Sequence, residues 1–349
     1  MKSYLCAFLF LLLVEKSPSA RVLPSTMDNI QHKFSPTQPN EPPPKIKGLS
    51  LVKEYYSDFG FLQSSGPFND YMDEETITAT KTYQQYFNLQ VTGYLNDETF
   101  QQISLPRCGV PDMNFNYGFT DNASWPKAGN RWFPERNNLT YGFDPASDIQ
   151  PNMIKVFRDA FERWAQATTG VLRLTETTYD KADIKVGFRI FNNIWDLVFS
   201  LSFIILQPGS NVTTGDIRLN SAKLWSLPSE NESQLSWEDG VLDLESAAMH
   251  QIGHLLGLDH SNKEDSVMYP NVLPSQQRKV ELSVSDMENI QRHYTNGNSG
   301  HSGRWGVLLI TTLSLGIWVY ELIRNNFMTV DLNIMHVLFP QPLFNNLLH

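Results

Sequence analysis

The most constraining feature of this sequence is the string that starts at His250 and reads His-Gln-Ile-Gly-His-Leu-Leu-Gly-Leu-Asp-His-Ser. On a helix, His250 and His254 lie one turn above each other, so both imidazoles can reach one ion. Gly257 lets the chain leave the helix and turn back, which delivers His260 as a third ligand. Three neutral nitrogens leave zinc one open tetrahedral position, as a catalytic site requires. A histidine pair alone could be incidental, but the full spacing makes chance a poor explanation.

This string resembles the elongated zinc-binding motif of the metzincins. Ser261, directly after the third histidine, favours the matrixin branch of that family. The segment Ser-Val-Met-Tyr-Pro at residues 266–270 is similar to the family's Met-turn. The resemblance implies that Met268 lies beneath the three imidazoles as an apolar floor, although a methionine there could also simply fill the core.

The cysteine content points to a specific partner for one thiol. The chain has two cysteines, and Cys6 lies in a segment that we interpret as a signal peptide, so Cys108 would have no disulfide partner in the mature chain. The surrounding Pro-Arg-Cys-Gly-Val-Pro-Asp resembles the matrixin latency motif. A thiolate binds zinc strongly, so Cys108 can fill the open position and exclude water. The resemblance further implies that Arg107 and Asp112 pair to hold this loop.

One residue departs from the catalytic pattern. Matrixins have Glu after the first zinc ligand, where it takes a proton from zinc-bound water and passes it to the leaving amine, but this chain has Gln251. Loss of a general base costs about 10²–10⁴ in rate. We therefore expect an extracellular zinc endopeptidase with reduced activity, made as a zymogen. The alternative is an inactive pseudoprotease that binds peptides or inhibitors, and a third class is a purely structural wall protein.

A second departure lies between Gly187 and Leu219, where matrixins have a loop rich in Gly, Asp and His that binds a structural zinc and calcium. No histidine occurs between His32 and His250, which excludes a histidine-based structural zinc there, and no calcium loop is recognisable. One catalytic Zn²⁺ is therefore the expected cofactor, with Ca²⁺ left open. Within the apolar run 197–206, residues 202–206 are a candidate edge strand for pairing with a peptide.

Apolar periodicity and turn signals divide the chain. We expect three short helices at 49–61, 73–87 and 97–103, strands at 138–143, 171–175 and 183–188, and helices at 151–165, 245–258 and 283–294. Ile154, Phe157, Phe161 and Trp164 are expected on one buried face. The fold class is α+β: a metzincin catalytic domain with a twisted mixed sheet and helices, preceded by a small three-helix prodomain similar to peptidoglycan-binding domains.

The expected boundaries are a signal peptide at 1–20, a Pro-rich linker at 21–45, the prodomain at 46–105, the connector with the latency motif at 106–130, the catalytic domain at 131–296, a linker at 297–304, a hydrophobic membrane segment or glycolipid-anchor signal at 305–323, and a tail at 324–349. No propeller domain is expected, and the hydrophobic segment favours the short plant-type matrixins.

The remaining signals concern location and partners. Glycosylation sequons begin at Asn122, Asn138, Asn211 and Asn231, which fits a secreted, extracellular-matrix or cell-surface protein. The net charge of −10 argues against a nucleic-acid partner. We expect protein or peptide substrates, contact with the chain's own prodomain, a monomeric state, and a membrane attachment whose mode stays open.

Overall fold

The computed structural model describes residues 43–113, 123–126, 136–191, 195–206, 213–228, 241–272 and 278–294. All of these described residues belong to one compact unit. The signal peptide, the hydrophobic segment 305–323 and the sequons at Asn122, Asn211 and Asn231 lie outside the described residues. Within those ranges, no helix combines the length and the apolar composition that a membrane crossing requires. Asn138 is exposed at the start of a strand, which suits a modification site.

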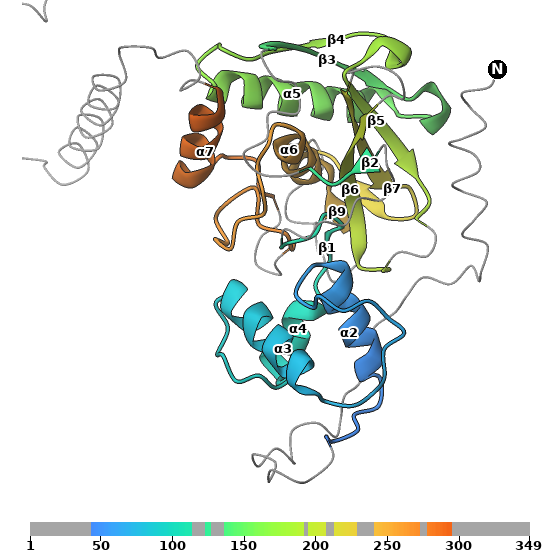
Figure 1. Ribbon diagram of the computed structural model, residues 1–349. Coiled ribbons are helices and arrows are strands. Elements are labelled where there is room, and N and C mark those ends of the chain that lie inside the picture. Colours follow the sequence, from blue (N-terminus) through green and yellow to red (C-terminus); the bar gives the residue numbers. More distant parts are fainter. Residues whose placement is uncertain are drawn as a thin grey trace, which may run out of the picture. The chain divides into compact units, whose positions relative to one another are not determined.

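The three helices expected near the N-terminus are present and are called here the helical domain (Figure 1). They are α2 (Leu49–Asp58), α3 (Glu74–Tyr86) and α4 (Asp97–Ile103). The side chain of Asp73 caps α3 by accepting from the Thr76 amide, and Asn96 caps α4 in the same way. Aromatic side chains of α2 and α3 pack together in a buried cluster. Tertiary packing, rather than intrinsic helix propensity, therefore stabilises these short helices.

Residues 136–294, called here the sheet domain, contain most of a seven-stranded mixed sheet. The strand order is β1-β6-β7-β5-β3-β4, with β2 also paired to β6. Strands β3, β4, β5 and β7 run parallel, whereas β6 is antiparallel to β7. The strands are β1 (Arg107–Cys108), β2 (Ala123–Ser124), β3 (Asn138–Phe143), β4 (Arg173–Glu176), β5 (Ile184–Arg189), β6 (Val198–Leu206) and β7 (Thr213–Asn220).

Three α-helices complete the sheet domain, namely α5 (Pro151–Ala167), α6 (Leu244–Leu255) and α7 (Val284–Tyr294). A small parallel pair, β8 (Leu224–Ser226) and β9 (Val241–Asp243), leads directly into α6. Single 3-10 turns lie at Pro145–Ser147 and Tyr179–Lys181. Strands combined with separate helices confirm the α+β class.

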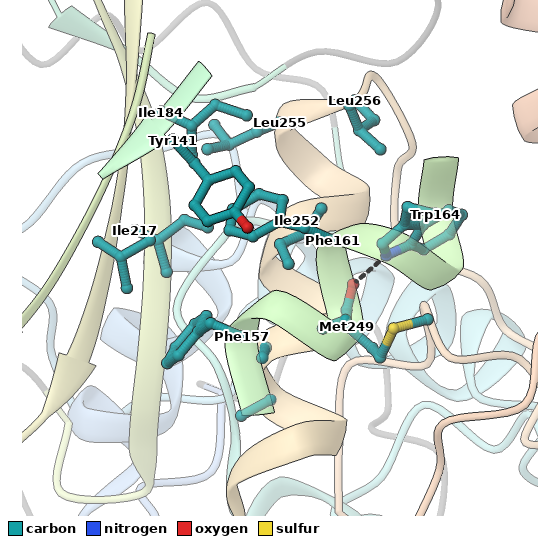
Figure 2. Close-up of a cluster of buried hydrophobic side chains, with 14 of the residues drawn as sticks. Tyr141, Phe157, Phe161, Trp164, Ile184, Ile217, Met249, Ile252, Leu255 and Leu256 are labelled. Carbon is teal, nitrogen blue, oxygen red and sulfur yellow. Dashed lines mark hydrogen bonds between the residues drawn. The ribbon is translucent and has the colours of Figure 1, made fainter. Parts of the chain in front are cut away.

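The main core lies between the sheet and helices α5 and α6. Figure 2 shows Tyr141, Ile184 and Ile217 of the sheet facing aromatic side chains of α5 and apolar side chains of α6. Tyr141 stacks on Phe161 with ring centroids 3.9 Å apart. Trp164 donates its indole N–H to the Met249 carbonyl over 2.9 Å, which fixes α5 against α6. Phe157, Phe161 and Trp164 are buried as predicted.

The predicted face of α5 was wrong in one residue. Ile154 lies at the margin of the face and is only partly buried, and Val156 and Ala160 are buried instead. The face is therefore centred about one residue away from the position that the four large side chains suggested.

The expected edge strand is longer than predicted, and its outer side is covered. Strand β6 starts at Val198, and its outer side pairs in parallel with Arg107 and Cys108 of β1. Farther along, Ile204 and Ile205 pair with β2. Residues 202–206 do lie in a strand near the edge of the sheet, but that edge is not open for a peptide, because the chain's own segments β1 and β2 pair with β6.

A buried carboxylate joins the start of α7 to the loop that follows the third histidine. Asp286 accepts hydrogen bonds from the hydroxyl of Ser266 at 2.5 Å and the amide of Val267 at 3.0 Å. It also accepts from the amide and hydroxyl of Ser283, while the Ser283 hydroxyl accepts from the Asp286 amide at 3.2 Å. This reciprocal cap identifies Ser283 as the N-cap of α7.

Replacing Asp286 with Ala should lower the midpoint of thermal unfolding by about 6–12 °C, because the buried donors of Ser266 and Val267 and the partly buried donors of Ser283 would lose a charged acceptor worth about 3 kcal/mol. The matched control is Asp159→Ala, which removes only a solvent-exposed pair with Lys155 and should change the midpoint by about 2 °C or less. Equal shifts in the two variants would contradict this role for Asp286.

Candidate metal centre

Helix α6 carries the first two histidines of the motif. Asp243 caps the helix by accepting from the Ser246 amide at 2.7 Å, and the helix ends at Leu255. Gly257 then adopts a φ of 97°, a left-handed conformation that suits glycine. The chain turns back there and brings His260 against the two helical imidazoles, as the spacing predicted.

The three imidazoles converge through their Nε2 atoms. Nε2 of His250 lies 3.0 Å from that of His254 and 3.1 Å from that of His260. The Cys108 sulfur lies 3.6 Å from Nε2 of His254, and all four ligand atoms lie within 4.8 Å of one another. Tetrahedral zinc with ordinary bond lengths would separate two nitrogens by about 3.3 Å and a nitrogen from a sulfur by about 3.6 Å. The donor set therefore fits a single zinc ion.

Each imidazole is oriented through its other nitrogen. Nδ1 of His250 lies 2.8 Å from the Val267 carbonyl, and Nδ1 of His254 lies 2.9 Å from the Leu258 carbonyl. A carbonyl only accepts, so each Nδ1 carries the proton and leaves the Nε2 lone pair for a metal. Burial lowers the pKa of both histidines well below the usual range, and each is lowered further by a neighbouring imidazole. Neutral rings are the form that binds metal.

The third imidazole uses an acceptor from a distant part of the chain. Nδ1 of His260 lies 2.7 Å from Oδ1 of Asp112. Both carboxylate oxygens of Asp112 also accept from the Arg107 guanidinium at 2.8 Å. The Arg107–Asp112 pair expected from the resemblance is thus present. Burial raises the pKa of Asp112 to about 6, although Arg107 pulls it down. One carboxylate therefore connects the loop around Cys108 to a metal-site histidine.

The segment Pro106–Asp112, called here the latch loop, is held on both sides by backbone hydrogen bonds. On one side, the Arg107 amide donates to the Leu197 carbonyl at 2.9 Å and the Gly109 amide to Ser200 at 2.7 Å. On the other side, the Cys108 amide donates to the Pro270 carbonyl at 2.9 Å. A Cβ on Gly109 would collide with Val198, so this close approach requires glycine.

Burial raises the pKa of the Cys108 thiol to about 12. Without a bound metal ion, the sulfur would therefore stay protonated at neutral pH. A metal ion favours the thiolate strongly enough to reverse this preference. The position of the sulfur beside three nitrogens is consistent with the metal-ligand role that the motif suggested.

Gln251 is fully buried and contacts the sulfur directly. Its side-chain amide donates to the Cys108 sulfur at 3.0 Å and to the Ser200 hydroxyl at 2.8 Å. Its Oε1 atom is buried and has no hydrogen-bond partner among the described residues. The amide thus occupies the place expected for a general base but acts as a donor to the latch loop.

Met268 packs against α6 in the turn before the second histidine. A Cβ added at Gly253 would collide with the Met268 sulfur, and the Met268 side chain is buried. The carbonyl of Met268 accepts from the Ser261 amide at 2.9 Å, which links the Met-turn to the end of the histidine string. Met268 therefore belongs to the core that packs against α6, and its place beneath the three imidazoles stays a prediction.

Sequence analysis missed two residues that shape this centre, Ser200 and Asp286, and one contact of a third, Asp112. Ser200 hydrogen-bonds Gln251, Asp286 holds the Met-turn, and Asp112 contacts His260 as well as Arg107. A serine inside the apolar run of β6 was a usable signal for the first, because a polar residue on an inward position needs a partner. The contact between Asp112 and His260 spans 148 residues, and no local pattern predicts it.

If the four residues form a metal site, the full chain should bind one zinc ion, and His254→Ala should lose at least about 100-fold in affinity, more than a residue outside the ligand set would cost. Equilibrium dialysis followed by elemental analysis measures both. The control is His293→Ala on α7, which belongs to no ligand cluster among the described residues and should keep one zinc. Equal zinc content in the two variants would contradict the assignment.

Comparisons with known proteins identify the family. Residues 131–295 match the matrixin family model, and residues 47–103 match a putative peptidoglycan binding domain. The chain is 36% identical over 268 residues to Metalloendoproteinase 5-MMP of Arabidopsis thaliana, covering 74% of each protein. It is 33% identical to Metalloendoproteinase 1 of Glycine max, over 75% of this chain and 86% of that protein. Neutrophil collagenase of Homo sapiens is 30% identical, over 72% of this chain and 50% of that protein.

These findings confirm the resemblance that the histidine string indicated and the helical domain upstream of it. The chain therefore belongs to the matrixin family of zinc metalloendopeptidases.

Proposed function

We propose that this protein is a secreted matrixin made as a latent precursor, with His250, His254 and His260 as ligands of one catalytic zinc and Cys108 as the fourth ligand in the latent state. The observation that carries the proposal is the convergence of three Nε2 atoms and one sulfur within 4.8 Å of one another. Calcium sites and a second zinc site form no part of the proposal. Secretion is inferred from the signal-like N-terminal sequence and the sequons.

The chain's own residues divide the work of this site. When bound, zinc would polarise the peptide carbonyl and lower the pKa of a bound water to about 7. The three imidazoles, each fixed through Nδ1, would hold the ion. Removal of the latch loop would free the position of the Cys108 sulfur and the part of β6 that pairs with β1, Val198 to Ser200, along which an extended peptide could pair.

A pocket beside His250 gives the substrate side chain next to the cleaved bond a place to bind. It is lined by the α6 residues Ser246 and Ala247, by Phe199 of β6 and by Val267 and Val272. Because the pocket lies between β6 and the Met-turn, a peptide paired with β6 would direct a side chain into it. Asp243, Asn271 and Lys279 also line the pocket, but more of its lining is apolar, which favours a mainly apolar side chain.

Gln251 is the reason to propose reduced turnover. A neutral amide cannot accept and return a proton, so the step in which water loses its proton to the protein has no base at this position. A second candidate function is a pseudoprotease that binds peptides or inhibitors. The hydrogen bond from Gln251 to the Cys108 sulfur favours this candidate, because it makes the residue part of the latent state rather than of catalysis.

Replacing Gln251 with Glu in protein whose helical domain has been cleaved off and removed should raise kcat/KM on a generic peptide by about 10²–10⁴, because it restores a general base. Peptide hydrolysis measured with equal zinc occupancy in both proteins checks this. The control is Gln251→Ala, which should be no more active than the native residue. Equal activity of the Glu and Gln forms would refute the assigned role of position 251.

The latent state predicts that Cys108→Ser in the full chain makes zinc at least about tenfold faster to remove with a chelator, because a thiolate ligand is lost. Transfer of zinc to a coloured chelator measures the rate. Cys108→Ala should behave in the same way, which separates loss of the sulfur from any effect of the hydroxyl. Unchanged rates in both variants would show that the sulfur does not guard the metal.

A further inference from the structure

Between Gly187 and Leu219, where matrixins have an ion-binding loop, this chain has a segment with residues that contact the helical domain. Trp195, Leu197 and Val198 of this segment, together with Tyr269 after the Met-turn, form what we call the clamp surface of the sheet domain. Trp195, Val198 and Tyr269 are buried members of the hydrophobic core of the helical domain, and Leu197 packs against it. The two domains therefore share one core.

Trp195 makes the most specific contact of the clamp surface. Its ring lies edge-on to Tyr55 of α2 at a centroid distance of 5.9 Å. Its indole N–H donates to Oδ2 of Asp58, one turn farther along α2, over 2.9 Å. A tryptophan that is 98% buried and hydrogen-bonded at its polar end has the character of an interface hot spot.

Tyr269 provides a second, separate contact. Its ring lies 6.1 Å from that of Phe87 at the end of α3, at an interplanar angle of 85°. Gln102 of α4 donates to the Tyr269 hydroxyl at 3.3 Å and to Oδ1 of Asn271 at 3.1 Å. All three helices of the helical domain thus contact the sheet domain through side chains that are buried in the interface.

Helix α2 also holds the latch loop. The guanidinium of Arg107 lies 3.5 Å above the Phe59 ring and donates to the Tyr55 hydroxyl at 2.7 Å. The Asp112 amide donates to the Phe59 carbonyl at 3.0 Å. Trp195 and Arg107 contact the same tyrosine, so a fixed α2 keeps Cys108 beside the imidazoles.

We propose that the clamp surface retains the helical domain after the connector is cut, so that the two fragments stay together as one inhibited complex. The partner of this surface is the aromatic face of α2 and α3 of the same chain. The inference rests on the proposed function, because the complex is inhibited only if the latch loop blocks the zinc site. Cutting the connector removes the effective concentration that a linker supplies, so retention then depends on non-covalent contacts, namely those of the clamp surface and those of the latch loop.

The test uses the full chain with a recognition sequence for a site-specific protease inserted at Gly118, between the latch loop and β2. After complete cleavage, the two fragments should co-elute in size-exclusion chromatography at micromolar concentration, and Cys108 should stay protected from iodoacetamide. Trp195→Ala should weaken the complex at least about 30-fold, because loss of a hot-spot side chain has an effect of this size. Its fragments should then separate, and Cys108 should become alkylated.

Two further variants keep the test decisive if Trp195→Ala fails to fold. Trp195→Phe keeps a ring but loses the donor to Asp58, and should weaken the complex less than the alanine variant does. Asp58→Asn changes the helical side of the same hydrogen bond and should also weaken the complex less than Trp195→Ala does. The matched control is Leu224→Ala, an exposed apolar residue that belongs to neither hydrophobic cluster and should leave the fragments together.

The outcomes separate this inference from the proposed function. Separation of the native fragments on cleavage would overturn retention, and so would co-elution that every clamp variant leaves unchanged. Neither result depends on turnover, because elution and alkylation are measured without substrate. Failure of the proposed function would instead appear as a lack of bound zinc in the uncut chain, whatever the fragments do.

Discussion

The structure of the site depends on the electrostatic repulsion among three imidazoles, because the Nε2 atom of His250 lies about 3 Å from those of His254 and His260. With the Nδ1 protons of His250 and His254 committed to carbonyl acceptors, their Nε2 lone pairs point toward one another and repel. Burial lowers the pKa of each ring and prevents relief by protonation. A bound divalent cation would remove the repulsion and would stabilise the arrangement. The surrounding elements, from the cap of α6 to the Met-turn, serve to keep this geometry.

Two departures from the matrixin pattern have a common consequence. Matrixins have a carboxylate at the position of Gln251, and a thiolate would repel that carboxylate. The Gln251 amide instead donates a hydrogen bond to the sulfur. The segment that lacks the ion-binding loop places Trp195 against α2 of the helical domain. Both changes add contacts to the closed arrangement. Gln251 thus contacts the latch loop, and Trp195 contacts the helix that holds it, which agrees with the proposed second function in binding.

Local patterns predicted much of this molecule. The histidine spacing, the turn at Gly257 and most of the helices and strands follow from periodicity, turn chemistry and ligand spacing, all of which act within a few residues. The latch loop and its Arg107–Asp112 pair were expected from the resemblance to the matrixin latency motif. The contacts of Trp195 with α2 and of Asp112 with His260 join segments separated by more than 130 residues. Such contacts depend on how whole domains pack, so the sequence alone gave no basis for predicting them. The shift of the α5 face had a different, local origin, because the large side chains were given more weight than Val156 and Ala160.

The central claim is that one zinc ion binds three imidazoles and the Cys108 sulfur in the full chain. X-ray absorption spectroscopy of the zinc-loaded protein tests it most directly, because the spectrum distinguishes sulfur from nitrogen around the metal. The account predicts one sulfur at about 2.3 Å and three nitrogens at about 2.0–2.1 Å. A shell of nitrogen and oxygen without sulfur, or a coordination number of six, would contradict it.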